Sequence, residues 1–239
     1  MYNTTDSTAF NLDLNTIVEE AFERCGTEVR SGYDMKTARR SLNLLLLDWA
    51  NRGINLWTVE QGEQVLTYND GTYDLPVDTV DLLDHVIRTG TGTNQIDINI
   101  TRISGSTYAS IPNKNATGRP IQVWINRQSG ATNSIDVVQY PQILIWPKPD
   151  NSTTYTFVYW RLRRIQDAGS NGTVEPDIPF RLLPCMVAGL AFYMAQKLPD
   201  GQARVQFLKQ EYEEQWLMAS TEDREKAASR FVPRTTFYA

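Results

Sequence analysis

The sequence has few of the residues that usually carry out chemistry. It contains one histidine and two cysteines among 239 residues. The common zinc sites combine four Cys or His ligands, so this count excludes them. Any Ser-His-Asp triad would have to use His85, and no Gly-x-Ser-x-Gly motif occurs. The composition therefore points away from the commonest hydrolases and metalloenzymes.

Long apolar runs and a disulfide framework are also absent. Cys25 and Cys185 lie far apart in helical apolar patterns, so we expect two reduced, buried cysteines in a protein made in a cytosol. The longest charge-free apolar segment, 182–196, is shorter than the ~20 residues of a membrane span, so we expect a buried helix and no membrane partner. The first thirteen residues are polar, and no signal peptide is expected.

What is present is the composition of an ordinary globular protein. Hydrophobic residues make up 41% of the chain and charged residues 21%. The formal net charge of -5 argues against wholesale wrapping of nucleic acid, which needs a basic face.

Four helices are predicted, two toward each end of the chain. Apolar residues recur at helical spacing over 14–25 and 34–53, and again over 183–198 and 205–219. A linker rich in Gly, Asn and Pro, 166–177, precedes the second pair. Neither pair is expected to be stable alone, so the two pairs should meet and bury their apolar stripes.

Capping residues delimit the first two helices. Asp13 is the expected N-cap of the first helix and Gly26 its stop. Asp34 is the expected N-cap of the second. Leu44 and Leu47 widen the apolar stripe of the second helix, which predicts packing on more than one side.

The middle of the chain has the sequence pattern of a β domain. Segments 63–68 and 72–75, joined by Asn69-Asp70-Gly71, are predicted to form a hairpin. Short alternating runs continue to about residue 165, with a spacing typical of an antiparallel barrel or sandwich. The further strands are expected at 80–88, 96–100, 121–126, 136–140, 142–146 and 154–162.

The sequence therefore predicts an α+β fold. A four-helix bundle, with two N-terminal and two C-terminal helices, would carry an inserted antiparallel β domain and an extended C-terminal tail. The expected boundaries are 1–57 for the N-terminal helices, 58–165 for the β domain, 166–228 for the C-terminal helices and 229–239 for the tail.

The end of the chain is basic and aromatic although the whole chain is acidic. Residues 226–239 contain no acid, and Pro233 interrupts any helix there. Such a tail either folds back onto its own domain or docks into another chain. Exposed Phe, Tyr and Arg are the residue types that anchor interfaces. The expected partner-binding residues are Arg230, Phe231, Val232, Pro233, Arg234, Phe237 and Tyr238.

Two other functions compete with docking. His85 is either a general base or a polar strand position. Asp78, Asp81 and Asp84 would share one face of a helix and could serve a metal-dependent hydrolase, or they are solvated charges beside a core strand.

The second alternative is a β-sheet module that binds nucleic acid or carbohydrate, with Trp124, Trp146 and Trp160 as its platform. Arginines could supply a phosphate-binding patch or simply pair with local acids. They are Arg119, Arg127, Arg161, Arg163 and Arg164.

Several segments, in their order along the chain, carry a family resemblance. The N-terminal half contains Ile17-Val-Glu-Glu-Ala-Phe-Glu-Arg-Cys-Gly26, Arg39-Arg-Ser-Leu-Asn-Leu-Leu-Leu-Leu-Asp-Trp-Ala-Asn-Arg-Gly53 and Tyr73-Asp-Leu-Pro76. Later come Tyr108-Ala-Ser-Ile-Pro-Asn-Lys114, Gly118-Arg-Pro120, Trp146-Pro-Lys-Pro-Asp150, Ile178-Pro-Phe-Arg181 and Gly189-Leu-Ala191. In this order the chain resembles the head–tail adaptor, or connector, proteins of tailed bacteriophages, chiefly the short-tailed ones.

The resemblance implies a structural protein of the virion with no enzymatic activity and no cofactor. Such adaptors form a twelve-fold ring beneath the portal protein, and their C-terminal segment reaches into the portal. The opposite side receives the tail nozzle or tail-fibre proteins, and genomic double-stranded DNA passes through the ring. The expected location is the neck of the virion, after synthesis in the host cytoplasm.

Overall fold

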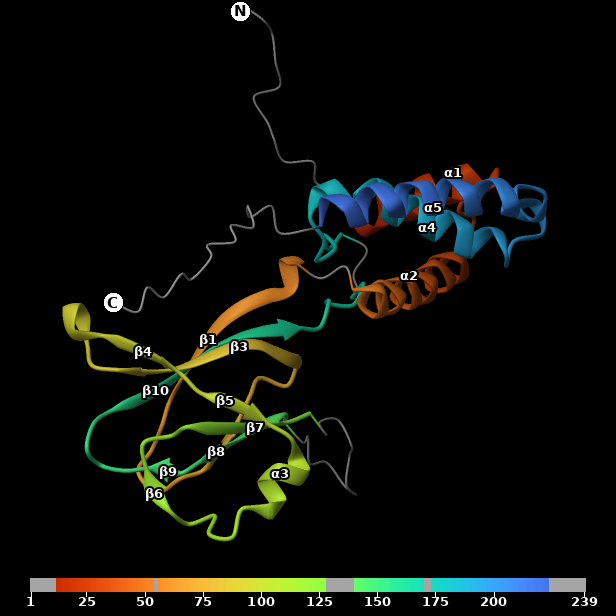
Figure 1. Cartoon of the computed structure of the whole chain (residues 1–239). Helices are drawn as coiled ribbons and strands as arrows, with labels where there is room; N and C mark the ends of the chain where they lie inside the picture. Colours follow the sequence, from red (N-terminus) through yellow and green to blue (C-terminus); the bar gives the residue numbers. More distant parts are fainter. Residues whose placement is uncertain (1–11, 54–55, 128–139, 170–172, 224–239) are drawn as a thin grey trace, which may run out of the picture. The chain divides into compact units, whose positions relative to one another are not determined.

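The computed structural model describes residues 12–53, 56–127, 140–169 and 173–223. It combines helices with largely antiparallel sheets, which confirms the predicted α+β class. The chain divides into two compact units (Figure 1). The helical unit contains the residues up to Leu56 and those from Asp167 onward, and the β unit spans Trp57–Gln166.

Four long helices make up the described part of the helical unit. α4 contacts each of the other three, and it is buried nearly all round because apolar residues occupy every face. Short 3-10 helices precede and follow it, η3 (Phe180–Leu182) and η4 (Pro199–Arg204). The long helices are α1 (Leu14–Cys25), α2 (Gly32–Arg52), α4 (Leu183–Ala195) and α5 (Val205–Glu222).

Close helix contact depends on Gly189 of α4. A Cβ at this position would lie 2.9 Å from the methyl groups of Leu45 and 2.9 Å from the ring of Tyr212. Glycine therefore lets α2 and α5 both approach the α4 backbone.

The helix caps confirm one prediction and correct another. Asp13 accepts the backbone N–H of Thr16 at 2.8 Å, and Gly26 ends α1 with φ 83°. The predicted N-cap of the second helix was wrong, because α2 begins at Gly32 and Ser31 is its N-cap. Asp34 instead accepts the backbone N–H of Ser31 at 3.0 Å, which completes a capping box.

The β unit contains two four-stranded sheets. The first has the order β1–β10–β3–β4 with every pair antiparallel. The second has the order β2–β8–β7–β5, and its β5–β7 pair is parallel. The strands of the first sheet are β1 (Val59–Val65), β3 (Thr79–Thr89), β4 (Ile96–Asn99) and β10 (Tyr155–Arg163). Those of the second are β2 (Thr72–Asp74), β5 (Thr101–Ile103), β7 (Gln122–Asn126) and β8 (Gln142–Trp146).

Shorter elements connect these strands. A two-stranded parallel ladder joins β6 to β9, so the predicted all-antiparallel pairing was incomplete. The connecting elements are η1 (Leu56–Thr58), η2 (Gly92–Asn94), α3 (Gly105–Ser110), β6 (Thr117–Gly118) and β9 (Lys148–Pro149).

The predicted hairpin over 63–75 was wrong. β1 pairs with β10 and β2 pairs with β8, so the intervening turn leads from one sheet to the other. The hydroxyl of Tyr73 fastens this turn, since it accepts the N–H of Thr67 at 2.8 Å and lies 3.0 Å from the carbonyl oxygen of Asp70. Most of the strand predicted at 136–140 lies outside the described residues.

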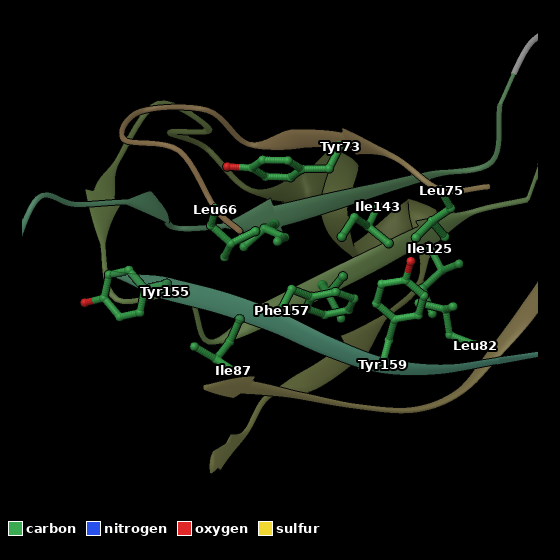
Figure 2. Packing of buried hydrophobic residues seen from close by; sticks show 12 residues of the cluster. Leu66, Tyr73, Leu75, Leu82, Ile87, Ile125, Ile143, Tyr155, Phe157 and Tyr159 are labelled. Atoms are coloured by element: carbon green, nitrogen blue, oxygen red, sulfur yellow. The ribbon is translucent and has the colours of Figure 1, made fainter. Parts of the chain in front are cut away.

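The core of the β unit lies between the two sheets. Side chains from β3 and β10 meet side chains from β2, β7 and β8, and Figure 2 shows these residues gathered between the ribbons. The two sheets therefore pack face to face and bury one side of each. The cluster consists of Leu66, Tyr73, Leu75, Leu82, Ile87, Val123, Ile125, Ile143, Ile145, Tyr155, Phe157 and Tyr159.

Candidate functional site: exposed docking faces

The predicted partner-binding residues, 230–234, 237 and 238, lie outside the described residues. The described chain ends just after α5, at Asp223, whose carboxylate is 1% exposed. That carboxylate accepts hydrogen bonds from Arg181 at 3.0 Å and from the backbone N–H of Leu56 at 3.1 Å. The point from which the C-terminal segment departs is thus fixed to the helical unit.

His85 does not have the surroundings of a general base. It is buried on β3, and its ring stacks on Phe157 with 5.8 Å between centroids. Among the described residues neither ring nitrogen makes a well-directed hydrogen bond, although the backbone of Ile100 lies near. Burial lowers the pKa of His85, and the charge of Asp84 opposes this shift. The imidazole is therefore a neutral part of the packed sheet.

The three aspartates predicted as a metal candidate do not converge. Asp81 accepts hydrogen bonds from Arg102 at 2.9 Å and Arg127 at 3.1 Å, which ties β3 to residues of the second sheet. Asp78 precedes β3 and pairs with an arginine of β10, while Asp84 accepts the next backbone N–H. Within the described ranges, no group of three or more His, Cys, Asp or Glu side chains could hold a metal ion.

The arginines of β10 pair with local acids. Arg161 donates to Asp78 at 2.6 Å and to Glu60 at 2.7 Å, and Arg163 donates to Glu60 at 2.7 Å. Both arginine side chains are 12% exposed, and the hydrogen bond from Arg161 lowers the pKa of Asp78. These contacts neutralise the predicted phosphate patch at its centre. The other members are spread apart: Arg127 pairs with Asp81, Arg119 is exposed after β6, and the Arg164 N–H donates to the carbonyl oxygen of Asp78.

The tryptophans do not form one platform. Trp160 lies on β10 in the first sheet, whereas Trp124 and Trp146 lie on β7 and β8 in the second. Trp124 packs on Tyr108 of α3 with 5.3 Å between ring centroids, and the Trp146 Nε1–H donates to the carbonyl oxygen of Asn113 at 3.0 Å. The geometry therefore does not favour the nucleic-acid or carbohydrate module.

Both cysteines are structural thiols. Cys25 and Cys185 are free and buried, and the Cys25 thiol donates to the carbonyl oxygen of Ala191 at 3.2 Å. Burial raises the pKa of Cys25 to about 11 and that of Cys185 to about 12. This confirms the prediction of two reduced, buried cysteines.

Large apolar side chains are exposed on the outer side of α2. Leu44 and Leu47, from which packing of this helix on more than one side was predicted, are 54% and 63% exposed, and Tyr33 is 69% exposed. With Arg40 they form a stripe whose successive members are seven, four and three residues apart, opposite the buried residues of the helix. We call this stripe the α2 face.

A second exposed stripe lies on α5. Phe207, Leu217 and Met218 are each exposed by at least 64%, and Glu214 lies between them along the helix. We call these four residues the α5 face. Neither face is covered by the part of the chain that the structure describes, and several large apolar groups exposed on one side of a helix typically mark an interaction site.

No single helix in the described ranges is long and apolar enough to cross a membrane, and the pair 180–195 and 199–222 meets that test only together, across a 119° bend. No curated protein matches the chain. A family model described as SU10 adaptor protein matches residues 16–234, which covers both units. A match over most of the chain, which includes both the helical segments at its two ends and the β unit between them in sequence, shows that the chain belongs to the SU10 adaptor protein family of bacteriophages.

Proposed function

We propose that this protein is a virion structural adaptor of a short-tailed phage. Copies form a ring, twelve-fold as in the related connectors, between the portal protein and the tail. The ring gives genomic DNA a conduit and gives nozzle or tail-fibre proteins a docking surface in the virion neck. The match to the adaptor family over residues 16–234 is the observation that carries this proposal.

The helical unit has a specific part in this role. We propose that α1, α2, α4 and α5 act as one four-helix bundle that supplies the contacts between neighbouring copies. A closed ring needs a heterologous interface, in which two different surfaces of the subunit meet. The exposed α2 and α5 faces support this assignment because both lie on the helical unit.

Residues 229–239 are the proposed portal anchor. They combine Arg230 and Arg234 with Phe231, Phe237 and Tyr238, which suit the buried centre of an interface. The last described residue before them, Asp223, is held to the helical unit by Arg181. Part of the binding free energy is offset if the segment orders on docking.

The anchor is tested by pull-down of the portal protein. The full chain, a form lacking 229–239, and the variant Phe231→Ala/Phe237→Ala are compared with the matched control Thr235→Ala/Thr236→Ala. We expect the truncation and the phenylalanine variant to lose the portal and the threonine variant to keep it. Recovery of portal by the truncated protein would refute the anchor.

The conduit role predicts weak attraction for DNA. The chain carries a net charge of -5, and its β10 arginines are paired with Glu60 and Asp78. DNA that must slide needs no strong grip, so the free subunit should show no tight, salt-sensitive affinity. A filter-binding titration at several salt concentrations measures this, and tight binding that weakens steeply with salt would favour the nucleic-acid module instead.

A further inference from the structure

The α2 face borders a shallow groove. Between α2 and the end of α4 lies a cavity of about 450 Å³, lined by Tyr33, Arg40 and Leu44 from α2 and by Met194 and Lys197 from the other side. The rim carries two exposed cations, Arg40 and Lys197, and one acid, Asp34, so its net charge is positive. The Asp34 carboxylate is engaged by the backbone N–H groups of Arg30 and Ser31. Arg40 donates to the hydroxyl of Thr37 at 3.4 Å and makes no ion pair with any described residue. The groove thus offers an apolar floor with a positive edge.

The α5 face has the complementary character. Phe207 stands at one end and Leu217 with Met218 at the other, and the carboxylate of Glu214 lies between them. Glu214 accepts a hydrogen bond from Gln210 at 2.9 Å, and no described cation pairs with it. This face therefore presents apolar ends and a negative centre.

The two faces also match in spacing. Tyr33, Arg40 and Leu44 follow one another by seven and four residues, and Phe207, Glu214 and Met218 do the same. Two helices laid side by side in one direction would set aromatic against aromatic, Arg40 against Glu214, and leucine against methionine. Side chains at this spacing interlock in helix pairs that cross at a shallow angle.

The faces point away from each other within one chain. Trp49 on the buried side of α2 donates its indole N–H to the hydroxyl of Tyr212 on the buried side of α5, and the exposed stripes lie opposite those buried sides. α4 contacts both helices (Figure 1). One subunit can therefore use its α2 face and its α5 face at the same time, with a different neighbour on each.

We infer that the α2 face of one copy binds the α5 face of the next copy, with Arg40 paired to Glu214 and Leu44 packed against Met218. The contact rests on the proposed ring and names its two surfaces. Because the surfaces differ, each subunit has one of each to offer, and association continues until a ring closes. The partner that fits is a second copy of this chain, because the negative centre of the α5 face complements the positive rim of the α2 groove in charge and in spacing.

Two surface variants test this contact in the full chain. Leu44→Glu damages only the α2 face and Met218→Glu only the α5 face; circular dichroism checks that both remain folded. Sedimentation velocity should show wild-type protein forming species larger than a dimer, and each variant associating at least about tenfold more weakly, which corresponds to 1.4 kcal/mol. A mixture of the two variants should form a heterodimer and nothing larger, because only one intact pair of faces remains. If either variant associates as well as the wild type, or the mixture gives no heterodimer, the contact is overturned.

A charge exchange and a cross-linking experiment test the same contact without the Leu44→Glu and Met218→Glu variants. Arg40→Glu and Glu214→Lys should each weaken association, and the protein carrying both changes should recover it. A photoreactive amino acid at position 44 should attach to a peptide from 205–222 of another copy. Attachment to the protein's own carboxyl-terminal residues or to the portal would assign the α2 face to that occupant and overturn the inference.

The outcomes separate this contact from the adaptor role. Portal capture by a wild-type protein that does not associate through these faces refutes the contact and leaves the adaptor role standing. Association through the faces without portal capture supports the contact and refutes the adaptor role.

Discussion

The indole N–H of Trp49 donates to the hydroxyl oxygen of Tyr212 at 3.0 Å, with both side chains almost fully buried. This hydrogen bond joins the N-terminal helices to the C-terminal helices across 163 positions of sequence. Arg52 lies over the rings of Tyr212 and Trp216, at 5.6 Å and 4.8 Å from their centroids, and closes the cluster from outside. The joint between the two ends of the chain is thus a polar contact inside an aromatic cluster.

Tyr212→Phe should destabilise the helical unit by about 1–3 kcal/mol, because the indole N–H of Trp49 would remain buried without an acceptor. Urea unfolding followed by tryptophan fluorescence measures the change. Tyr33→Phe, at an exposed tyrosine of the same unit, is the control and should leave stability nearly unchanged. Equal stability of Tyr212→Phe and wild type would show that the hydrogen bond contributes nothing.

Gly189→Val should cost at least about 2 kcal/mol, because the new side chain would collide with Leu45 and Tyr212. Gly32→Ala is the matched control, since a Cβ there meets nothing within 4 Å. Thermal unfolding of the two variants compares them directly. A Gly189→Val protein as stable as Gly32→Ala would mean that the helices can move apart at no cost.

His85 should make the β unit less stable in mild acid. Its pKa is lowered from 6.5 in the folded protein, so between that lowered value and 6.5 the unfolded chain binds the proton more readily. Stability therefore falls as pH drops below 6.5 and levels off once both states are protonated. His85 is the only histidine, so replacing it should remove most of this dependence.

The measurement is the urea midpoint of the β-unit transition at a series of pH values, for wild type and His85→Phe. The phenylalanine variant keeps a ring stacked on Phe157 and should show a flatter profile between neutral pH and pH 5. An unchanged profile in the variant would place the titrating group elsewhere.

Arg161→Met should destabilise the β unit by about 1–2 kcal/mol, since Asp78 loses its ion pair and Glu60 keeps only its ion pair with Arg163. Arg127→Met is the control, because its side chain is 58% exposed and surface pairs contribute less than about 1 kcal/mol. Chemical unfolding at moderate ionic strength gives both values. The reverse order of the two costs would contradict this account of the β10 arginines.

The two native thiols should resist alkylation in the folded protein. Their raised pKa values, about 11 for Cys25 and about 12 for Cys185, leave little thiolate at pH 8, and burial blocks access. Pulsed iodoacetamide labelling with intact mass analysis should show no addition before unfolding. A cysteine placed at the exposed position of Asn151 serves as the positive control, and rapid labelling of the native pair would contradict their burial.

The helices could be predicted from sequence because their determinants are local. The stripe ending at Cys25, the cap at Asp13 and the stop at Gly26 lie within one or two turns of the residues that they organise. The start of α2 was misplaced because Ser31 and Asp34 both suit an N-cap, and only their mutual hydrogen bonds decide between them.

Strand pairing could not be predicted in the same way. The turn at 69–71 has a strong hairpin signal, yet Val59 pairs with Leu162, about a hundred positions away. Burial of the inner face of each sheet outweighs the local turn preference, and no short pattern carries that information. The extra leucines Leu44 and Leu47 indicated a second apolar side of α2. The sequence of one chain does not show whether such residues contact the same chain or another one.

The pairing of β1 with β10 means that the inserted unit begins and ends at adjacent points. Its entrance at Val59 and its exit at Leu162 are held together by the sheet itself. The entropic cost of closing the loop between β1 and β10 is offset by the pairing of these two strands, and this cost grows only slowly with the length of the loop. Residues could therefore be inserted between these two strands, or exchanged there, while the helical framework kept its stability.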